Sequence, residues 1–201
     1  MQSFAIVPAA GKSTRMGQQK LLLPFAGATV IEHVLRAWQA SAVSGVVIVV
    51  RSDDHDLREV CEATTANLVI AETPPAEMKD SVQLGLQFVE QNCSPADEDV
   101  WLLAPADMPE LSPAVVDALL AAHEVRAPAI LAPMVGGKRG HPVLFPWAMA
   151  LEIEELGADE GVNALLVRHE FRRIACADPS ILHDLDSPDD YQRLRNRHEP
   201  S

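Results

Sequence analysis

The sequence is poor in cysteine and in positive charge, and it has no long apolar run. Its three cysteines, Cys61, Cys93 and Cys176, are odd in number and far apart, which argues against a disulfide framework and against a zinc site. The 29 acidic residues outnumber the 16 lysines and arginines, for a net charge of −13, so most of the surface would repel a nucleic acid. No run approaches the roughly 20 apolar residues of a membrane span, and residues 1–10 lack the features of a signal peptide. We therefore expect a cytoplasmic protein that binds neither nucleic acid nor membrane.

The apolar residues predict strands and helices that alternate around one core. At 201 residues, the chain suits a single domain, residues 1–201. The alternation predicts a three-layer α/β/α domain with a mostly parallel central sheet. The expected strands span residues 4–7, 46–51, 67–71, 100–104 and 129–133, and the expected helices span 29–41, 54–66, 79–91 and 113–124. After residue 133 we expect a glycine turn, a strand over 142–145, helices over 147–156 and 161–169, strands over 172–176 and 181–185, and a last helix from Pro188.

A short segment centred on a glycine follows the first expected strand. It reads Ala9-Ala10-Gly11-Lys12-Ser13-Thr14-Arg15-Met16-Gly17, with Lys20 three residues on, and we call residues 9–17 the glycine segment. Two common phosphate motifs do not fit, because a Walker A loop needs glycine at Ile6 and a dinucleotide loop needs glycine at Ser13 and Met16. Three cations without a nearby acid, beside several backbone N–H groups, are typical of a polyphosphate site. Open α/β sheets bind their ligands at this end of the strands.

The pattern A-A-G-x-S-x-R-M-G-x-x-K-x-L-L-P resembles the nucleotidyltransferases of the MobA/MocA type, which join a nucleotide to the phosphate of molybdopterin. The resemblance implies a Rossmann-like α/β/α fold of the nucleotide-diphospho-sugar transferase type, with a mixed, mostly parallel sheet. It implies a nucleotide-binding half over about 1–110 and an acceptor half over about 111–195. It also implies an Mg²⁺-dependent enzyme, with Mn²⁺ as a substitute, in which a molybdopterin phosphate attacks the α-phosphate of a nucleoside triphosphate and releases pyrophosphate. A molybdoenzyme or a cofactor-insertion protein is a further expected partner.

The resemblance assigns the nucleotide to the glycine segment and to the start of a later helix. Arg15 would hold two phosphate oxygens, and Lys20 would place a positive charge near the α-phosphate. Residues 78–82 are similar to the family's G-M-x-x-S-L, so Ser81 either contacts the nucleotide or is only a serine in a first helical turn. Glu77 stands where the family usually has glycine. The expected nucleotide-binding residues are Ala9, Ala10, Gly11, Lys12, Ser13, Arg15, Lys20 and Ser81.

Asp107 and Asp186 are the expected metal ligands. Asp107 follows the expected strand over 100–104, so its carboxylate would emerge at the same rim as the glycine segment. One carboxylate with phosphate oxygens and waters is an ordinary Mg²⁺ site. Residues 184–191 resemble the family's D-I-D-T-P-E-D-Y, which implies that Asp186 completes the site, and an extended strand would put Asp184 on the same side. Ser187 and Pro188 also read as a helix start, which explains the pattern without chemistry. The expected catalytic residues are Lys20, Arg15 and Asp107.

The acceptor is expected at residues 137–145, which resemble the family's G-x-x-G-H-P-V-L-F. This resemblance assigns acceptor contacts to Arg139, Gly140 and His141, although His141 also suits a hydrogen-bonded position in the core. Asn163 stands where the family usually has arginine, which leaves the identity of the acceptor open.

The residues before Gly11 bear on the base. Members that use GTP commonly read A-G-G, whereas Ala9-Ala10-Gly11 resembles the users of pyrimidines, and a methyl group on residue 10 fills space that a purine would need. CTP is therefore the favoured nucleotide. The alternatives are a molybdopterin guanylyltransferase, another cytidylyl- or sugar-phosphate nucleotidyltransferase and, outside the enzymes, a cofactor-binding chaperone or regulator.

Overall fold

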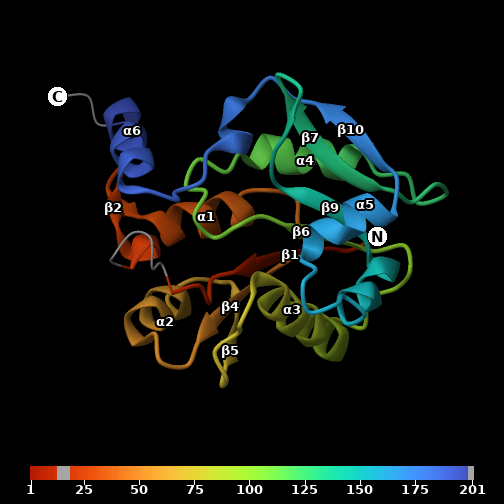
Figure 1. The fold of residues 1–201 in the computed structure, drawn as a ribbon, viewed down its shortest axis with the longest axis horizontal. Coiled ribbons are helices and arrows are strands. Elements are labelled where there is room, and N and C mark those ends of the chain that lie inside the picture. The colour runs from red at the N-terminus through yellow and green to blue at the C-terminus, as the bar shows by residue number, and fades with distance from the viewer. Residues whose placement is uncertain (13–18, 199–201) are drawn as a thin grey trace.

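The computed structural model describes residues 1–12 and 19–198 (Figure 1). The expectations for Ser13 and Arg15 lie outside the described residues. Within the described residues, eight strands form one sheet in the order β10-β7-β9-β6-β1-β4-β5, with β8 paired to β7. These strands are β1 (Ser3–Pro8), β4 (Gly45–Arg51), β5 (Asn67–Ala71), β6 (Val100–Leu103), β7 (Ile130–Val135), β8 (Lys138–Arg139), β9 (Val143–Pro146) and β10 (Phe171–Ala175).

The sheet is mostly parallel, and β8 and β9 run against the other strands. This confirms the predicted three-layer fold with a mixed, mostly parallel sheet. Figure 1 shows β1 and β6 in the middle of the molecule, with β4 and β5 below them and β7 and β10 above. A separate two-stranded ribbon consists of β2 (Pro24–Phe25) and β3 (Ala28–Thr29).

Helices cover both faces of the sheet because successive side chains of each strand point to opposite faces. In β1, Ala5 and Val7 belong to one buried cluster, whereas Phe4 and Ile6 belong to the other. The first cluster includes residues of α1 (Val30–Gln39), α2 (His55–Glu62), α4 (Pro113–Ala122) and α6 (Pro188–His198). The second includes residues of α3 (Met78–Cys93) and α5 (Leu165–Arg168). No helix of residues 1–12 and 19–198 has both the length and the apolar character needed to cross a bilayer.

Local sequence signals begin several of these helices. Thr29 and Glu32 exchange the two hydrogen bonds of a capping box at the start of α1. The Asp54 side chain accepts the Leu57 N–H at the start of α2. Pro113 occupies the first turn of α4, where its missing N–H costs nothing. Each helix therefore starts where its own residues satisfy or remove the N–H groups that a first turn leaves open.

The expected strand over 181–185 is wrong. Pro179–Leu182 form a short 3₁₀ helix, η6, and residues 183–187 have no regular secondary structure. The Asp178 side chain accepts the Ser180 N–H at 2.9 Å, which favours a helical turn at this point. Asp184 and Asp186 therefore do not lie on a strand and do not share one face of it, contrary to the prediction.

The helices expected over 147–156 and 161–169 are shorter than predicted. The structure has three 3₁₀ turns, η3 (Trp147–Met149), η4 (Leu151–Ile153) and η5 (Val162–Ala164), followed by α5. The last helix is confirmed as α6, where Ser187 and Asp190 exchange N–H hydrogen bonds in a capping arrangement.

Candidate active site

The site lies where the order of the strands reverses. β1 pairs with β4 on one side and with β6 on the other, and open α/β sheets bind ligands at such a switch point, beyond the carboxyl ends of the strands. The glycine segment follows β1, and Asp107 follows β6. A pocket of about 650 Å³ opens there. It is lined by all the expected nucleotide and metal residues that the structure describes, namely Ala9, Ala10, Gly11, Lys12, Lys20, Ser81, Asp107 and Asp186.

The backbone N–H groups of residues 9–12, the described part of the glycine segment, are of two kinds. The Ala9 N–H donates to the Val49 carbonyl at 2.9 Å, so it extends the ladder between β1 and β4 and is not available to a ligand. The N–H groups of Ala10, Gly11 and Lys12 donate to no other residue in the described part of the chain. A Cβ atom built on Gly11 would meet nothing within 4 Å. The segment therefore offers donors and open space to a phosphate group.

Lys20 lines the pocket and contacts residues that are distant from it in the chain. It begins the 3₁₀ helix η2 (Lys20–Leu22). Its Nζ contacts Asp107 Oδ2, donates to the Leu185 carbonyl at 2.9 Å and lies 3.7 Å from Asp186 Oδ1. The carboxylates of Asp107 and Asp186 thus both lie close to the ammonium group of Lys20.

Asp107 is a buried carboxylate, with 7% of the residue exposed. Burial raises the pKa of Asp107, Lys20 opposes this rise, and the charge of Asp184 adds to it. Its Oδ1 is buried and accepts no hydrogen bond within the described residues. A buried acceptor of this kind is costly unless a donor or a cation binds to it.

The donor set fits a hard divalent cation. The oxygen that lacks a partner belongs to a carboxylate, the preferred ligand of Mg²⁺ and Mn²⁺. The side chain of Asp186 is 54% exposed and lies on the same pocket. The described residues include no group of three or more histidine, cysteine, aspartate or glutamate side chains that could hold a metal ion. A cation here would therefore need oxygens from substrate and water as well.

Helix α3 brings Ser81 to the wall of the pocket. Ser81 is 3% exposed and lies in the first turn of α3. Glu77, the residue where the family usually has glycine, is the N-cap of this helix with φ −135° and ψ 166°. This is ordinary extended backbone, so glutamate is accommodated here without strain.

The three expected acceptor residues do not line this pocket. Arg139 donates to Asn163 Oδ1 at 2.8 Å, so it contacts the residue that replaces the family's usual arginine. A Cβ atom on Gly140 would lie 2.5 Å from the Ile181 carbonyl oxygen, so packing alone requires glycine there. The His141 N–H donates to the same carbonyl at 2.9 Å. Burial lowers the pKa of His141, and a backbone hydrogen bond at Leu103 opposes this shift.

Several residues of the pocket wall were not predicted. Pro74, Pro75 and Ala76 follow β5 and line the pocket. Pro8 and Pro105 also line it. The carboxyl end of β5 lies at the same edge of the sheet as those of β1 and β6, so its following loop was a signal for the site. Prolines restrict the backbone of this wall, because each fixes its own φ angle.

Comparisons with known proteins agree with this geometry. The profile of the MobA-like NTP transferase domain matches residues 5–173. The molybdenum cofactor cytidylyltransferase of Escherichia coli (strain K12) is 24% identical over 193 residues, 96% of this chain and 95% of that protein. The purine catabolism protein PucB of Bacillus subtilis (strain 168) is 29% identical over 197 residues, 93% of each chain. The crystal structure of Rv0371c from Mycobacterium tuberculosis H37Rv has a TM-score of 0.83 at 26% identity, and the match covers 98% of this chain and 99% of Rv0371c. The complex of Rv0371c with manganese has a TM-score of 0.79. The chain therefore belongs to the MobA-like NTP transferase domain family and is a nucleotidyltransferase of this type.

Proposed function

We propose that this protein transfers a nucleotidyl group from a nucleoside triphosphate, with CTP favoured, to the phosphate of a molybdopterin-type acceptor and releases pyrophosphate. One observation carries this proposal: residues 9–12 of the glycine segment, Lys20 and the carboxylates of Asp107 and Asp186 converge on one pocket at the switch point of the sheet. Hydrogen-bond donors that can bind phosphate, placed beside carboxylates that can bind a metal ion, suit a polyanionic substrate that binds together with a metal ion.

The reaction needs position and positive charge more than it needs a base. An oxygen of the acceptor phosphate attacks the α-phosphorus of the nucleotide, and the bond from that phosphorus to the pyrophosphate oxygen breaks. The attacking phosphate is already an anion, so no side chain has to remove a proton from it. The N–H groups of Gly11 and Lys12 bind and orient the phosphates, and the ammonium groups of Lys12 and Lys20 stabilise the charge on pyrophosphate. Arg15 is proposed to assist as a bidentate donor.

Asp107 and Asp186 would hold Mg²⁺ or Mn²⁺. The ion supplies positive charge that lets several phosphate oxygens approach one another. The proposal rests on the buried Asp107 Oδ1 that accepts no hydrogen bond from a described residue, and the similar Rv0371c has been solved in complex with manganese.

The proposals for base and acceptor rest on different support. CTP is proposed because Ala10 lines the pocket and is only 5% exposed, and because a relative at 24% identity is a cytidylyltransferase. The acceptor is proposed from that relative and from residues 137–145, which resemble the family's acceptor block and include Arg139, Gly140 and His141. PucB, at 29% identity, is named as a purine catabolism protein, so the acceptor is the part of the proposal that most needs an experiment.

Pyrophosphate release tests the proposal directly. The protein is supplied with ATP, CTP, GTP or UTP and Mg²⁺, with and without molybdopterin. We expect release with CTP that depends on molybdopterin. Release with GTP alone would make the protein a guanylyltransferase, release with another acceptor would replace molybdopterin, and nucleotide binding without release under any condition would favour the chaperone or regulator.

Asp107→Asn should lower the metal-dependent turnover at least ~100-fold, because the amide keeps the shape of the side chain but removes the charge that binds a hard cation. Urea unfolding shows whether the variant is folded. The matched control is Asp97→Asn, which removes an exposed carboxylate from a loop that does not line the pocket. If a folded Asp107→Asn protein keeps most of its activity and metal dependence, the metal must be bound elsewhere.

A further inference from the structure

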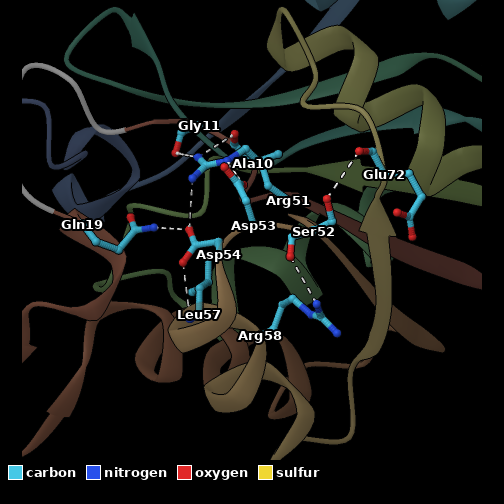
Figure 2. A network of polar contacts seen from close by, with 10 residues as sticks. All are labelled: Ala10, Gly11, Gln19, Arg51, Ser52, Asp53, Asp54, Leu57, Arg58 and Glu72. Atoms are coloured by element: carbon cyan, nitrogen blue, oxygen red, sulfur yellow. Dashed lines mark hydrogen bonds and ion pairs between the residues drawn. The ribbon is translucent and has the colours of Figure 1, made fainter.

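We propose that Arg51 is a positioning residue for the nucleotide site, which orients the phosphate-binding N–H groups from behind the pocket and acts together with Asp54. Its consequence for catalysis rests on the proposed function. Arg51 ends β4, the strand that neighbours β1, and it does not line the pocket. Figure 2 shows its guanidinium group among the carbonyls of the glycine segment and two aspartates.

Each of the three nitrogens of the Arg51 guanidinium group contacts a different partner. Nη1 donates to the carbonyls of Ala10 at 3.4 Å and Gly11 at 3.3 Å. Nε donates to Asp53 Oδ1 at 2.7 Å, and Nη2 lies 3.8 Å from Asp54 Oδ2. The side chain of Arg51 is only 12% exposed, so this planar fork is held in one orientation by its surroundings.

Peptide geometry converts these contacts into an orientation of donors. In a trans peptide, the C=O of one residue and the N–H of the next point in opposite directions. A cation that holds the carbonyls of Ala10 and Gly11 therefore turns the N–H groups of Gly11 and Lys12 to the opposite side. Gly11 and Lys12 line the pocket, and a hydrogen bond at a carbonyl also polarises its peptide group, which makes the N–H a stronger donor.

Asp54 extends the same network to the other flank of the site. It is 9% exposed, and its Oδ1 accepts the Leu57 N–H at 3.4 Å at the start of α2. Its Oδ2 faces Arg51 and also accepts a hydrogen bond from Gln19 Nε2. Gln19 directly precedes Lys20, the residue that contacts Asp107. Arg51 and Asp54 therefore link Gly11 and Gln19, which flank residues 12–18 in sequence, to the end of β4.

Arg58 provides a matched control. It lies on α2 and donates from Nη1 to the Ser52 carbonyl at 3.2 Å (Figure 2), so it stabilises the same connection between β4 and α2. It is not hydrogen-bonded to the glycine segment within the described residues. The Arg58 variant therefore shows how much phosphate binding changes when a cation that only stabilises the connection between β4 and α2 is lost.

The experiment compares Arg51→Gln, Arg51→Lys and Arg58→Gln with the unmodified protein. Calorimetric titration measures the affinity for inorganic tripolyphosphate, steady-state kinetics measure KM for the nucleotide and kcat, and urea unfolding measures stability.

We expect both Arg51 variants to bind tripolyphosphate about tenfold more weakly and to raise KM about tenfold, because oriented donors to a charged ligand are lost. We expect kcat to change less than about threefold, because these donors hold the phosphates equally in the ground and transition states. Lysine should not restore function, because its single nitrogen cannot occupy the positions of Nη1, Nε and Nη2 at once. Arg58→Gln should leave KM and the affinity within about twofold of the unmodified values.

The possible results separate this inference from the proposed function. Unmodified protein that binds neither tripolyphosphate nor any nucleoside triphosphate would overturn both. Unmodified protein that binds them, with Arg51 variants that bind as well as Arg58→Gln does, would overturn the positioning role alone. Rescue by Arg51→Lys, or loss of kcat at constant KM and affinity, would also overturn it.

Discussion

At the scale of the residue, Ala10 lies between Ala9, which is hydrogen-bonded to the sheet, and Gly11, which lines the pocket. The N–H of Ala9 completes the ladder between β1 and β4, and Gly11 leaves open space at the pocket. Ala10 itself is 5% exposed and lines the pocket. One methyl group in a pocket wall discriminates between ligands by about 1–3 kcal/mol.

Ala10→Gly should therefore relax the choice of base. We expect the ratio of kcat/KM for CTP to that for GTP to fall about tenfold, because the space needed by a purine becomes available. The measurement is pyrophosphate release with each nucleotide at limiting concentration. The matched control is Ala106→Gly, a change of the same size at another buried alanine of the pocket, which should leave the ratio within about threefold. A preference for GTP in the unmodified protein would contradict the assignment of CTP.

At the scale of the element, the contact of α3 with β1 sets the position of Ser81. Gly85 lies one turn after Ser81 on the buried side of α3, and a Cβ atom on Gly85 would lie 2.9 Å from Ile6 Cγ2. Ile6 is fully buried in the central strand β1, so its branched side chain has little freedom to move away. The glycine thus lets the helix approach the sheet closely, which explains a residue that is otherwise unfavourable inside a helix.

Gly85→Ala should destabilise the protein by about 1 kcal/mol. Alanine gains about 1 kcal/mol in helix propensity, but forcing a methyl group into a packed core costs about 1–3 kcal/mol. Urea unfolding measures the difference. Gln91→Ala, at an exposed position of the same helix, is the control and should change stability by less than about 0.5 kcal/mol. A stabilised Gly85→Ala protein would show that α3 can move outward at little cost.

At the scale of the whole molecule, the C-terminal helix returns to the loop that carries Asp107. Glu110 Oε2 accepts hydrogen bonds from His183 Nδ1 at 2.6 Å and from Arg197 at 2.8 Å, and its Oε1 contacts His198 Nε2 at 2.6 Å. Figure 1 shows α6 beside β2, and the His198 ring makes an edge contact with the Phe25 ring. The last helix is thus attached both to the Asp107 loop and to the β2–β3 ribbon.

This attachment should weaken in acid. Burial by itself raises the pKa of Glu110, but hydrogen bonds from His198 and His183 and the charge of Arg197 outweigh burial and leave the pKa below its ordinary value of 4.5. A carboxyl group with a lowered pKa in the folded state stabilises the protein above its unfolded pKa, and that stability is lost as the pH falls through the folded value.

Glu110→Gln should lower the free energy of unfolding by about 1–3 kcal/mol near neutral pH, because it removes hydrogen bonds to a charged group. The difference from the unmodified protein should shrink in acid, at a pH below the folded-state pKa of Glu110, which lies below 4.5. Urea unfolding at both pH values measures this. The control is Glu124→Gln, whose carboxylate is 62% exposed and pairs with Arg172 at the surface, and it should have little effect. A difference that stays constant with pH would contradict the assigned role of the Glu110 charge.

The sequence alone determined the central sheet and the rim of the site. The first five expected strands all exist, and the strand predicted over 67–71 is β5 with the same bounds. The runs of β1, β4, β6 and β7 can be identified locally because a strand that is buried on both faces must be apolar nearly throughout. The glycine segment and Asp107 were placed at one rim for a related reason, since the carboxyl ends of neighbouring parallel strands meet at the same edge of the sheet.

Only the tertiary structure decided the contacts between residues that are distant in the chain. Lys20 contacts Asp107 and Leu185, Gly140 packs against Ile181, and Arg51 holds the carbonyls of Ala10 and Gly11. The segment over 181–185 was predicted as a strand because a short apolar run does not distinguish a strand from a helical turn. Its actual course depends on the Asp178 side chain and on the hydrogen bond from His141 to Ile181. Periodicity reports which face of an element is buried, whereas the partner that buries it is chosen only when the whole chain has folded.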